Sequence, residues 1–166
     1  MEPSVIIGPA ENNGVDPEAI LAIDSACFAQ STVNVAAELE RPWSRVWVAR
    51  ASGTAGPLAF LLAWLVVDEL HILSVATLPP FRRQGLARAL LERAIEFSRE
   101  QKVRTILLEV RRSNAAAIRL YRAFRFSTVA LRPRYYADNF EDAVEMSLVL
   151  DPATGRIMPS EDAVSI

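Results

Sequence analysis

The sequence has few of the residues that bind metals or form disulfides. Among its 166 residues it has one cysteine, Cys27, and one histidine, His71. A lone cysteine cannot form an internal disulfide, and one thiol with one imidazole falls short of the usual ligand set of a structural zinc site. We therefore expect no resident metal and a protein of the cytoplasm, with Cys27 packed in the core.

Long apolar runs and a strong net charge are also missing. The longest apolar run, residues 58–67 (LAFLLAWLVV), is about half of the roughly 20 residues that a helix needs to span a bilayer. No basic segment followed by an apolar one opens the chain, as a secretion signal would. The formal net charge is -2 and the pI is about 5.5, so no global basic field attracts polyanions. We expect a soluble protein whose partner is neither a membrane nor a nucleic acid.

The apolar content is sufficient for one folded domain. The chain has 166 residues, of which 51% are hydrophobic. This length suits a single core and is short for two. We assign residues 1–150 to one domain. Residues 151–166 lack hydrophobic periodicity, which predicts a flexible C-terminal tail.

The hydrophobic periodicity predicts a mixed α/β fold. Strand and helix patterns alternate in the second half, with hairpin patterns on either side, which favours a mixed sheet with helices on both faces. Asp16 before Pro17 predicts the N-cap of the first helix. The predicted strands are residues 4–8, 45–51, 58–67, 70–77, 105–110, 126–131 and 143–150, and the predicted helices are residues 16–27, 34–40, 85–99 and 114–124.

The segment FRRQGLARALL (residues 81–91) joins a predicted strand to a predicted helix. A helix that begins after a glycine-bearing turn presents unpaired amides and the positive end of its dipole, which favours an anion such as a phosphate. The segment lacks the Gly-Lys-Ser/Thr of a P-loop and the three glycines of a dinucleotide fingerprint. Alternatively, Arg82 and Arg83 are solvated charges and Gly85 is an ordinary turn residue.

Three motifs in order resemble the GNAT superfamily of N-acetyltransferases, and the RimI-type N-terminal acetyltransferases in particular. They are the pattern Arg82-x-x-Gly85-x-Ala87, the segment LLEVRRSNAAAIRLYRAF and the segment RYYADNFEDAVEM. The resemblance implies a twisted, mostly antiparallel sheet with a splayed strand pair that holds acetyl-CoA. It further implies acetylation of a protein N-terminus, most specifically the N-terminal alanine of a small-subunit ribosomal protein, by direct transfer in a ternary complex.

Two other functions stay open beside this one. A GNAT enzyme could acetylate a small amine or a lysine side chain, and a protein with the same fold could bind acyl-CoA without catalysis. In all three cases acetyl-CoA, or another acyl-CoA, is the expected ligand. The resemblance implies that main-chain groups of a strand, the loop and start of a helix, and one asparagine contact acetyl-CoA. These residues are Val75, Ala76, Thr77, Arg83, Gln84, Gly85, Leu86, Ala87, Arg88 and Asn114.

Glu109 interrupts the apolar run of residues 106–110. A carboxylate in such a strand needs a partner or a wet cleft, because burying an isolated charge is unfavourable. One explanation is a salt bridge to Arg111 or Arg112. The resemblance implies instead that Glu109 is the general base, acting through water. An α-amine, with a pKa near 8, needs only modest help from such a base.

Tyr121 lies seven residues after Asn114, so both would face the same side of a predicted helix. The resemblance implies that Tyr121 protonates the leaving thiolate and that Asn114 contacts the cofactor. The alternatives are a core aromatic at Tyr121 and a helix cap at Asn114.

The loop after the sixth predicted strand carries Tyr135, Tyr136 and Glu141, which the resemblance assigns to the acceptor site. A merely solvated loop is the alternative. His71 could relay the proton of the amine, or could be a hydrogen-bonded histidine on a strand.

Two positions depart from RimI-type sequences. Residues 28–31 read Phe-Ala-Gln-Ser where Phe-Pro-Trp-Ser is common, and Arg125 stands where a glycine usually permits a left-handed turn.

Overall fold

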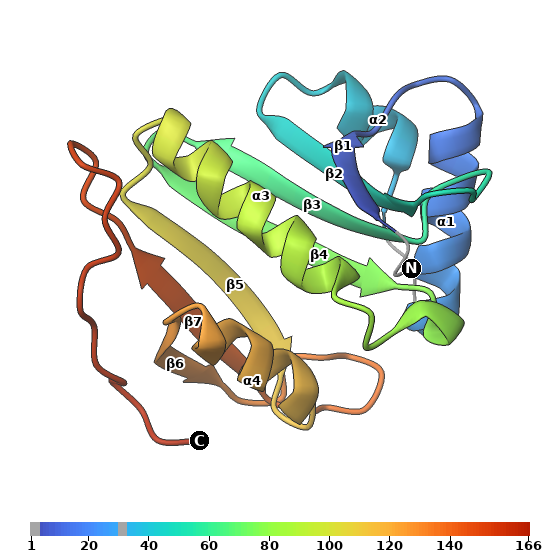
Figure 1. The fold of residues 1–166 in the computed structure, drawn as a ribbon. Helices are drawn as coiled ribbons and strands as arrows, with labels where there is room; N and C mark the ends of the chain where they lie inside the picture. Colours follow the sequence, from blue (N-terminus) through green and yellow to red (C-terminus); the bar gives the residue numbers. More distant parts are fainter. Residues whose placement is uncertain (1–3, 30–32) are drawn as a thin grey trace. The chain divides into compact units, whose positions relative to one another are not determined.

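The computed structural model describes residues 4–29 and 33–166. Within these ranges the chain forms seven strands and four α-helices, with a short 3-10 turn before the third helix (Figure 1). None of these helices is both long and apolar enough to cross a membrane. The elements are β1 (Val5–Pro9), α1 (Val15–Cys27), α2 (Val35–Glu40), β2 (Ser44–Ala51), β3 (Ala59–Val66), β4 (Glu69–Thr77), η1 (Pro79–Phe81), α3 (Leu86–Glu100), β5 (Thr105–Arg111), α4 (Ala115–Ala123), β6 (Ser127–Arg132) and β7 (Ala143–Val149).

The strands follow the order β1-β2-β3-β4-β5-β7-β6. Strands β4 and β5 pair in parallel, whereas β1–β2, β2–β3, β5–β7 and β6–β7 pair antiparallel. The prediction of a mixed, mostly antiparallel sheet with helices is therefore confirmed.

The chain divides into two compact units. The first comprises Met1–Leu65 and Leu73–Ala94, and the second comprises Val66–Ile72 and Ile95–Ile166. Strand β4 and helix α3 each contribute residues to both units. The assignment of residues 1–150 to one domain stays a prediction, and the two units are described separately below.

In the first unit, α1 and α2 pack on strands β2 to β4. Ile20 and Ile23 recur at helical spacing on α1 and are almost fully buried, which is typical of an amphipathic helix on a sheet. They pack with Phe60 of β3 and with other apolar side chains of the strands. The rest of this cluster is Val35, Val46, Val48, Leu62 and Ala76.

The start of α1 differs from the prediction. The N-cap is Gly14, with φ 84°, and the side chain of Asn13 accepts the amides of Val15 and Asp16. Asp16 is instead 1% exposed and forms an ion pair with Arg50 of β2. Its predicted role as N-cap was wrong because a long-range partner, which the local pattern does not reveal, takes its carboxylate.

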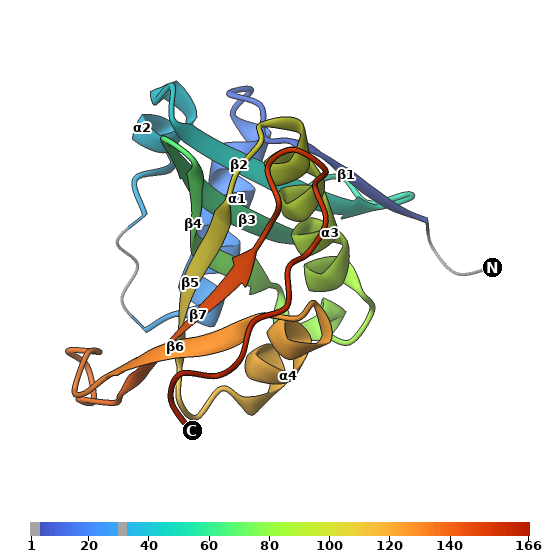
Figure 2. The same cartoon turned by 90° about the vertical axis from the view of Figure 1, so that its left-hand side faces the viewer.

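In the second unit, β5 alternates strictly between half-buried and buried positions. Ile106, Leu108 and Val110 point to the buried side, as expected for a strand with one covered face. Helix α4 lies beside β6 and β7 (Figure 2) and buries Ile118 and Tyr121.

The C-terminal segment follows β7 and runs back to β6. It has no regular secondary structure, as its sequence predicts, yet it makes contacts that the sequence does not predict. Leu150 bridges to Ile157, the Ala163 amide donates to the Thr128 carbonyl, and the Thr128 amide donates to the Asp162 carboxylate. These bonds place the segment along β6, while its flexibility stays a prediction.

Candidate active site

The candidate residues fall into two groups, one in each unit. The first group lies at the end of β4 and the start of α3. Arg83 and Gly85 have φ angles of 64° and 81°, so the loop turns through the left-handed region twice before the helix. A Cβ atom at Gly85 would meet nothing within 4 Å, so the backbone angle is what favours glycine there. The first amides of α3 lack carbonyl partners within the helix, as in any α-helix, and can bind an anion.

Arg82 holds this loop against β4. Its Nε donates to the Thr77 carbonyl at 3.2 Å, and its Nη2 lies 3.5 Å from Cys27 Sγ, which itself donates to the same carbonyl at 3.3 Å. Cys27 is half-buried and packs against the first unit's core. Arg82 is therefore tied to protein atoms, and the anion-binding role falls on the loop amides.

The carbonyl of Thr77 is hydrogen-bonded, whereas its side-chain hydroxyl lacks a partner among the described residues. Its carbonyl accepts the two bonds just described, whereas its buried hydroxyl oxygen has no hydrogen-bond partner in the described part of the chain. A buried hydroxyl without a partner is uncommon and fits a ligand that supplies one. This observation and the loop amides fit a cofactor with a pyrophosphate and an amide-bearing arm, as expected for acetyl-CoA.

The parallel ladder between β4 and β5 is short. Its last pair is Ile72 with Leu108, although β4 continues to Thr77 and β5 to Arg111. The ladder thus ends just before Glu109, the first candidate of the second group.

Glu109 is half-buried on β5, with its side chain 28% exposed. Its Oε1 lies 3.2 Å from Nε of Arg132 on β6. Interaction with the same carboxylate raises the pKa of Tyr135 above its usual value. The salt bridge that the sequence leaves open at Glu109 does exist, but with Arg132 and not with Arg111 or Arg112.

Tyr121 lies on the buried face of α4. Its side chain is 7% exposed, and burial raises its pKa to about 12, with a smaller contribution from Tyr136. The phenol therefore keeps its proton throughout the neutral range, as a general acid requires. The alternative of a core aromatic also holds in part, since Tyr121 contacts Phe126 with ring centroids 5.8 Å apart.

Asn114 precedes α4 and does not belong to its helical turns. Its Oδ1 accepts the amide of Ala117 at 3.2 Å, so the residue is the N-cap of α4. The helical-face argument that places Asn114 beside Tyr121 does not apply to an N-cap residue. Because the oxygen is engaged in capping, the side-chain NH2 group is what Asn114 can offer to a cofactor.

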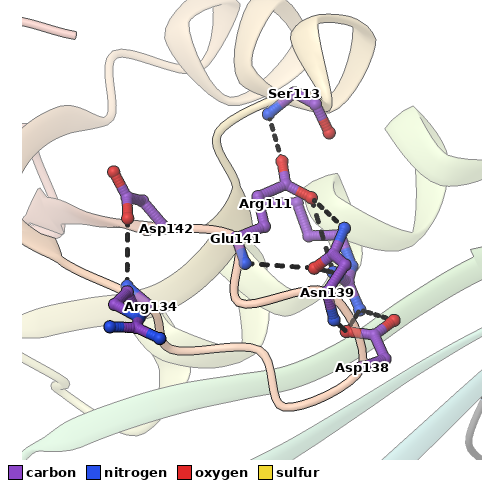
Figure 3. Close-up of polar contacts among 7 residues, drawn as sticks. All are labelled: Arg111, Ser113, Arg134, Asp138, Asn139, Glu141 and Asp142. Atoms are coloured by element: carbon purple, nitrogen blue, oxygen red, sulfur yellow. Dashed lines mark hydrogen bonds and ion pairs between the residues drawn. The ribbon is translucent and has the colours of Figure 1, made fainter.

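The loop between β6 and β7 is braced by ionic contacts (Figure 3). Arg111 binds Asp138 and Glu141, and its guanidinium lies 3.9 Å from the ring centre of Tyr136. Burial raises the pKa of Tyr136 to about 12. The Tyr135 and Tyr136 rings meet edge to face at 5.2 Å, so the two tyrosines form one aromatic wall.

Glu141, predicted to attract the acceptor, forms hydrogen bonds that hold its own loop in place. Its Oε1 accepts the Ser113 amide at 2.7 Å, and its Oε2 accepts bonds from Arg111 and Asn139 (Figure 3). The bond from Ser113 is the main reason that the Glu141 pKa falls to about 2. Glu141 thus joins the loop to the start of α4, and a role toward the acceptor stays a prediction.

His71 and Glu69 form a pair on β4. His71 Nε2 lies 2.7 Å from Glu69 Oε2, and both side chains are partly exposed. The alternative of a hydrogen-bonded histidine on a strand therefore holds, and the proton relay stays a prediction.

Sequence reasoning missed Arg132 and Glu145. Arg132 forms an ion pair with Glu109, and Glu145 forms an ion pair with Arg132. The signal that could have found Glu145 is a charge that interrupts an apolar strand, as at Glu109. Gln30 and Ser31, in the segment that departs from RimI-type sequences, lie outside the described residues. The described residues hold no group of three or more side chains that could bind a metal.

Comparisons with known proteins show the family to which the chain belongs. A profile of the acetyltransferase (GNAT) family matches residues 18–126. The ribosomal protein bS18-alanine N-acetyltransferase of Escherichia coli (strain K12) is 45% identical over 92 residues, which cover 54% of this chain and 62% of that protein. The putative ribosomal protein bS18-alanine N-acetyltransferase of Bacillus subtilis (strain 168) is 34% identical over 113 residues, 68% of this chain and 74% of that protein.

A solved structure extends the likeness over almost the whole chain. The crystal structure of the ribosomal-protein-S18-alanine N-acetyltransferase from Escherichia coli superposes with a TM-score of 0.78 at 30% identity, covering 98% of this chain and 100% of that chain. The sequence match to the Escherichia coli protein spans 62% of that protein's length. The family match over residues 18–126 and the shared fold show that this chain belongs to the acetyltransferase (GNAT) family.

Proposed function

We propose that this protein transfers an acetyl group from acetyl-CoA to the N-terminal α-amine of a protein. The observation that supports this most directly is Glu109, a partly exposed carboxylate that interrupts the apolar run of β5 and raises the pKa of Tyr135. A base beside an aromatic wall suits an amine at the end of a flexible chain.

The acceptor must lose a proton before or during attack. An α-amine has a pKa near 8, so roughly 10% of it is neutral at pH 7, whereas a lysine amine is neutral well under about 0.1% of the time. A carboxylate such as Glu109, directly or through a water, is a sufficient base for the first and a poor one for the second. This argument supports an N-terminal acceptor.

Acetyl-CoA, when bound, supplies a thioester whose acetyl group is already activated. The residues of this chain bind acetyl-CoA and protonate the departing sulfur. The loop amides before α3 bind the pyrophosphate, the end of β4 binds the arm, and Tyr121 holds a proton that the departing sulfur needs. The pKa of about 12 at Tyr121 means that the proton is present at any neutral pH. No protein nucleophile is required, so transfer is direct within a ternary complex.

The acceptor we infer is an N-terminal alanine of a small-subunit ribosomal protein, in the cytoplasm. The Escherichia coli and Bacillus subtilis relatives are named for that substrate, and the first is 45% identical over the matched 92 residues. The rings of Tyr135 and Tyr136, which meet edge to face, would shape a small site for the first residue of the acceptor.

The test uses the purified protein, acetyl-CoA and peptides that differ only in the first residue. Peptides with a blocked N-terminus and one internal lysine are included. Mass spectrometry should locate the acetyl group on the N-terminal amine, with alanine preferred over leucine or glutamate. Acetylation confined to the internal lysine, or to free small amines, would contradict the proposal. Acetyl-CoA binding without transfer to any amine would favour a non-catalytic module.

Two variants test the roles of the residues. Glu109→Gln should lower kcat by about 10²-fold or more while leaving the affinity for acetyl-CoA unchanged. Tyr121→Phe should lower kcat by about 10-fold or more, again with binding retained. A charge-matched control is Asp68→Asn, which breaks an exposed ion pair with Arg104. Wild-type turnover in Glu109→Gln would remove Glu109 as the base.

A further inference from the structure

Two carboxylates face each other across the ladder of β5 and β7. Glu109 and Glu145 are direct cross-strand partners. Like charges in this position repel, so a strand pair of this kind needs a cation beside it. Arg132, on the neighbouring strand β6, supplies that cation.

The contacts of Arg132 are unequal. Its Nε and Nη2 both reach Oε2 of Glu145, at 2.9 Å and 2.8 Å. Its contact with Glu109 is a single one, from Nε to Oε1 at 3.2 Å. Glu145 therefore anchors the guanidinium, and Glu109 makes the longer contact with it.

Other charged or titratable groups also face Glu109. Tyr135 and Tyr136 both interact with it, and Glu109 raises the pKa of each phenol. Arg111 is on the same strand, but it is committed to Asp138 and Glu141. From β4, the paired side chains of Glu69 and His71 lie on the same sheet face, because His71 aligns with Leu107, two residues before Glu109.

We propose that Arg132 is a positioning residue for the base of the proposed function. Anchored by Glu145, it orients the Glu109 carboxylate for the incoming amine. This inference rests on the proposed function, since it gives Glu109 the role of base. Arg132 itself touches neither the cofactor nor the acceptor in this scheme.

The sign of the effect separates this role from a structural one. Removing the cation with Arg132→Gln disfavours the carboxylate form of Glu109, and removing the opposing anion with Glu145→Gln favours it. The acidic limb of the kcat/KM profile should therefore move to higher pH in Arg132→Gln and to lower pH in Glu145→Gln. We expect a displacement of roughly half a pH unit in each case, the size typical of partly exposed pairs.

The experiment measures kcat/KM for an N-terminal alanine peptide between pH 5 and 9. In parallel, ¹³C NMR follows the titration of the Glu109 side-chain carboxyl without substrate. Arg132→Lys, which keeps the charge but not the two-pronged contact, should keep the wild-type limb with a lower kcat. The matched controls are Arg104→Gln and Asp68→Asn, which each break an exposed ion pair. Arg104 lies about five residues before Glu109 in the chain, which is roughly 17 Å in an extended strand.

The outcomes are distinguishable. Opposite displacements of the acidic limb, absent from both controls, support the positioning role. Displacements in the same direction, or none, overturn it even if the wild type is fully active. If the wild type acetylates no N-terminal amine, the proposed function fails. The NMR titrations then still decide whether Arg132 and Glu145 act on Glu109 with opposite signs, and equal titrations in all variants overturn the inference.

Discussion

The main-chain carbonyl of Tyr121 accepts the amide of Phe126 at 3.1 Å, and the two rings lie 5.8 Å apart. The amide of Arg125 meanwhile donates to the carbonyl of Arg122. This pair of bonds, with a left-handed residue between them, is the Schellman motif that ends many helices. Its customary apolar contact is here the contact between Phe126 and the candidate acid, so the end of α4 also positions the phenol.

Shortening Phe126 should therefore affect turnover as well as stability. Phe126 is 2% exposed, and Phe126→Leu should lower the free energy of unfolding by about 1 kcal/mol or more. Because the ring that supports Tyr121 is lost, kcat should also fall, by several-fold. Urea unfolding and steady-state kinetics measure both effects. Phe60→Leu, in the core of the first unit, is the control: it should destabilise the protein while kcat of the folded fraction stays unchanged.

Arg125 adopts φ 71°, so the left-handed turn is kept although the usual glycine is absent. For an L-residue this conformation costs about 1 kcal/mol. Arg125→Gly should therefore raise the free energy of unfolding by up to about 1 kcal/mol in urea denaturation. Arg125→Ala removes the same side chain but keeps the strained angle, and it should give no such gain. Equal gains in the two variants would show that the side chain, and not the backbone, is responsible.

Alkaline pH should unfold the protein through two tyrosines. The pKa values of Tyr121 and Tyr136 rise from 10.0 to about 12 in the folded chain. In the unfolded chain the phenols ionise near their ordinary pKa, so stability is unaffected below pH 10 and falls as the pH rises toward 12. Tyr121→Phe and Tyr136→Phe should each flatten this fall in urea titrations at pH 9 to 12. The exposed Tyr135 is a weaker contributor.

Acid should loosen the loop between β6 and β7 only at low pH. The Glu141 pKa falls from 4.5 to about 2, chiefly through the bonds from Ser113. A carboxylate whose pKa is lower in the folded state stabilises that state above its ordinary pKa, and the contribution is lost as the pH falls from 4.5 to about 2. Hydrogen exchange at the Ser113 amide should rise, relative to its intrinsic rate, in that window. In Glu141→Gln the exchange should already be faster at pH 6, with no further acid step.

Local patterns predicted most of the elements. The alternation in residues 105–110 and the helical spacing in residues 86–97 reflect burial on one face, which a single sequence can reveal. The side-chain partners could not be predicted in this way. Asp16 of α1 pairs with Arg50 of β2, and Glu109 of β5 pairs with Arg132 of β6, a strand that β7 separates from β5 in the sheet. Such contacts depend on the tertiary fold, so the sequence showed that Glu109 needed a partner without identifying it.

The C-terminal segment occupies main-chain groups of β6, the last strand in the order. The Thr128 carbonyl takes the amide of Ala163, and the Thr128 amide is taken by Asp162. An open edge strand is a template on which a second molecule can add a strand. A chain that ended at Leu150 would expose this template, and its main hazard would then be self-association that increases with concentration, even if the chemistry at Glu109 were intact.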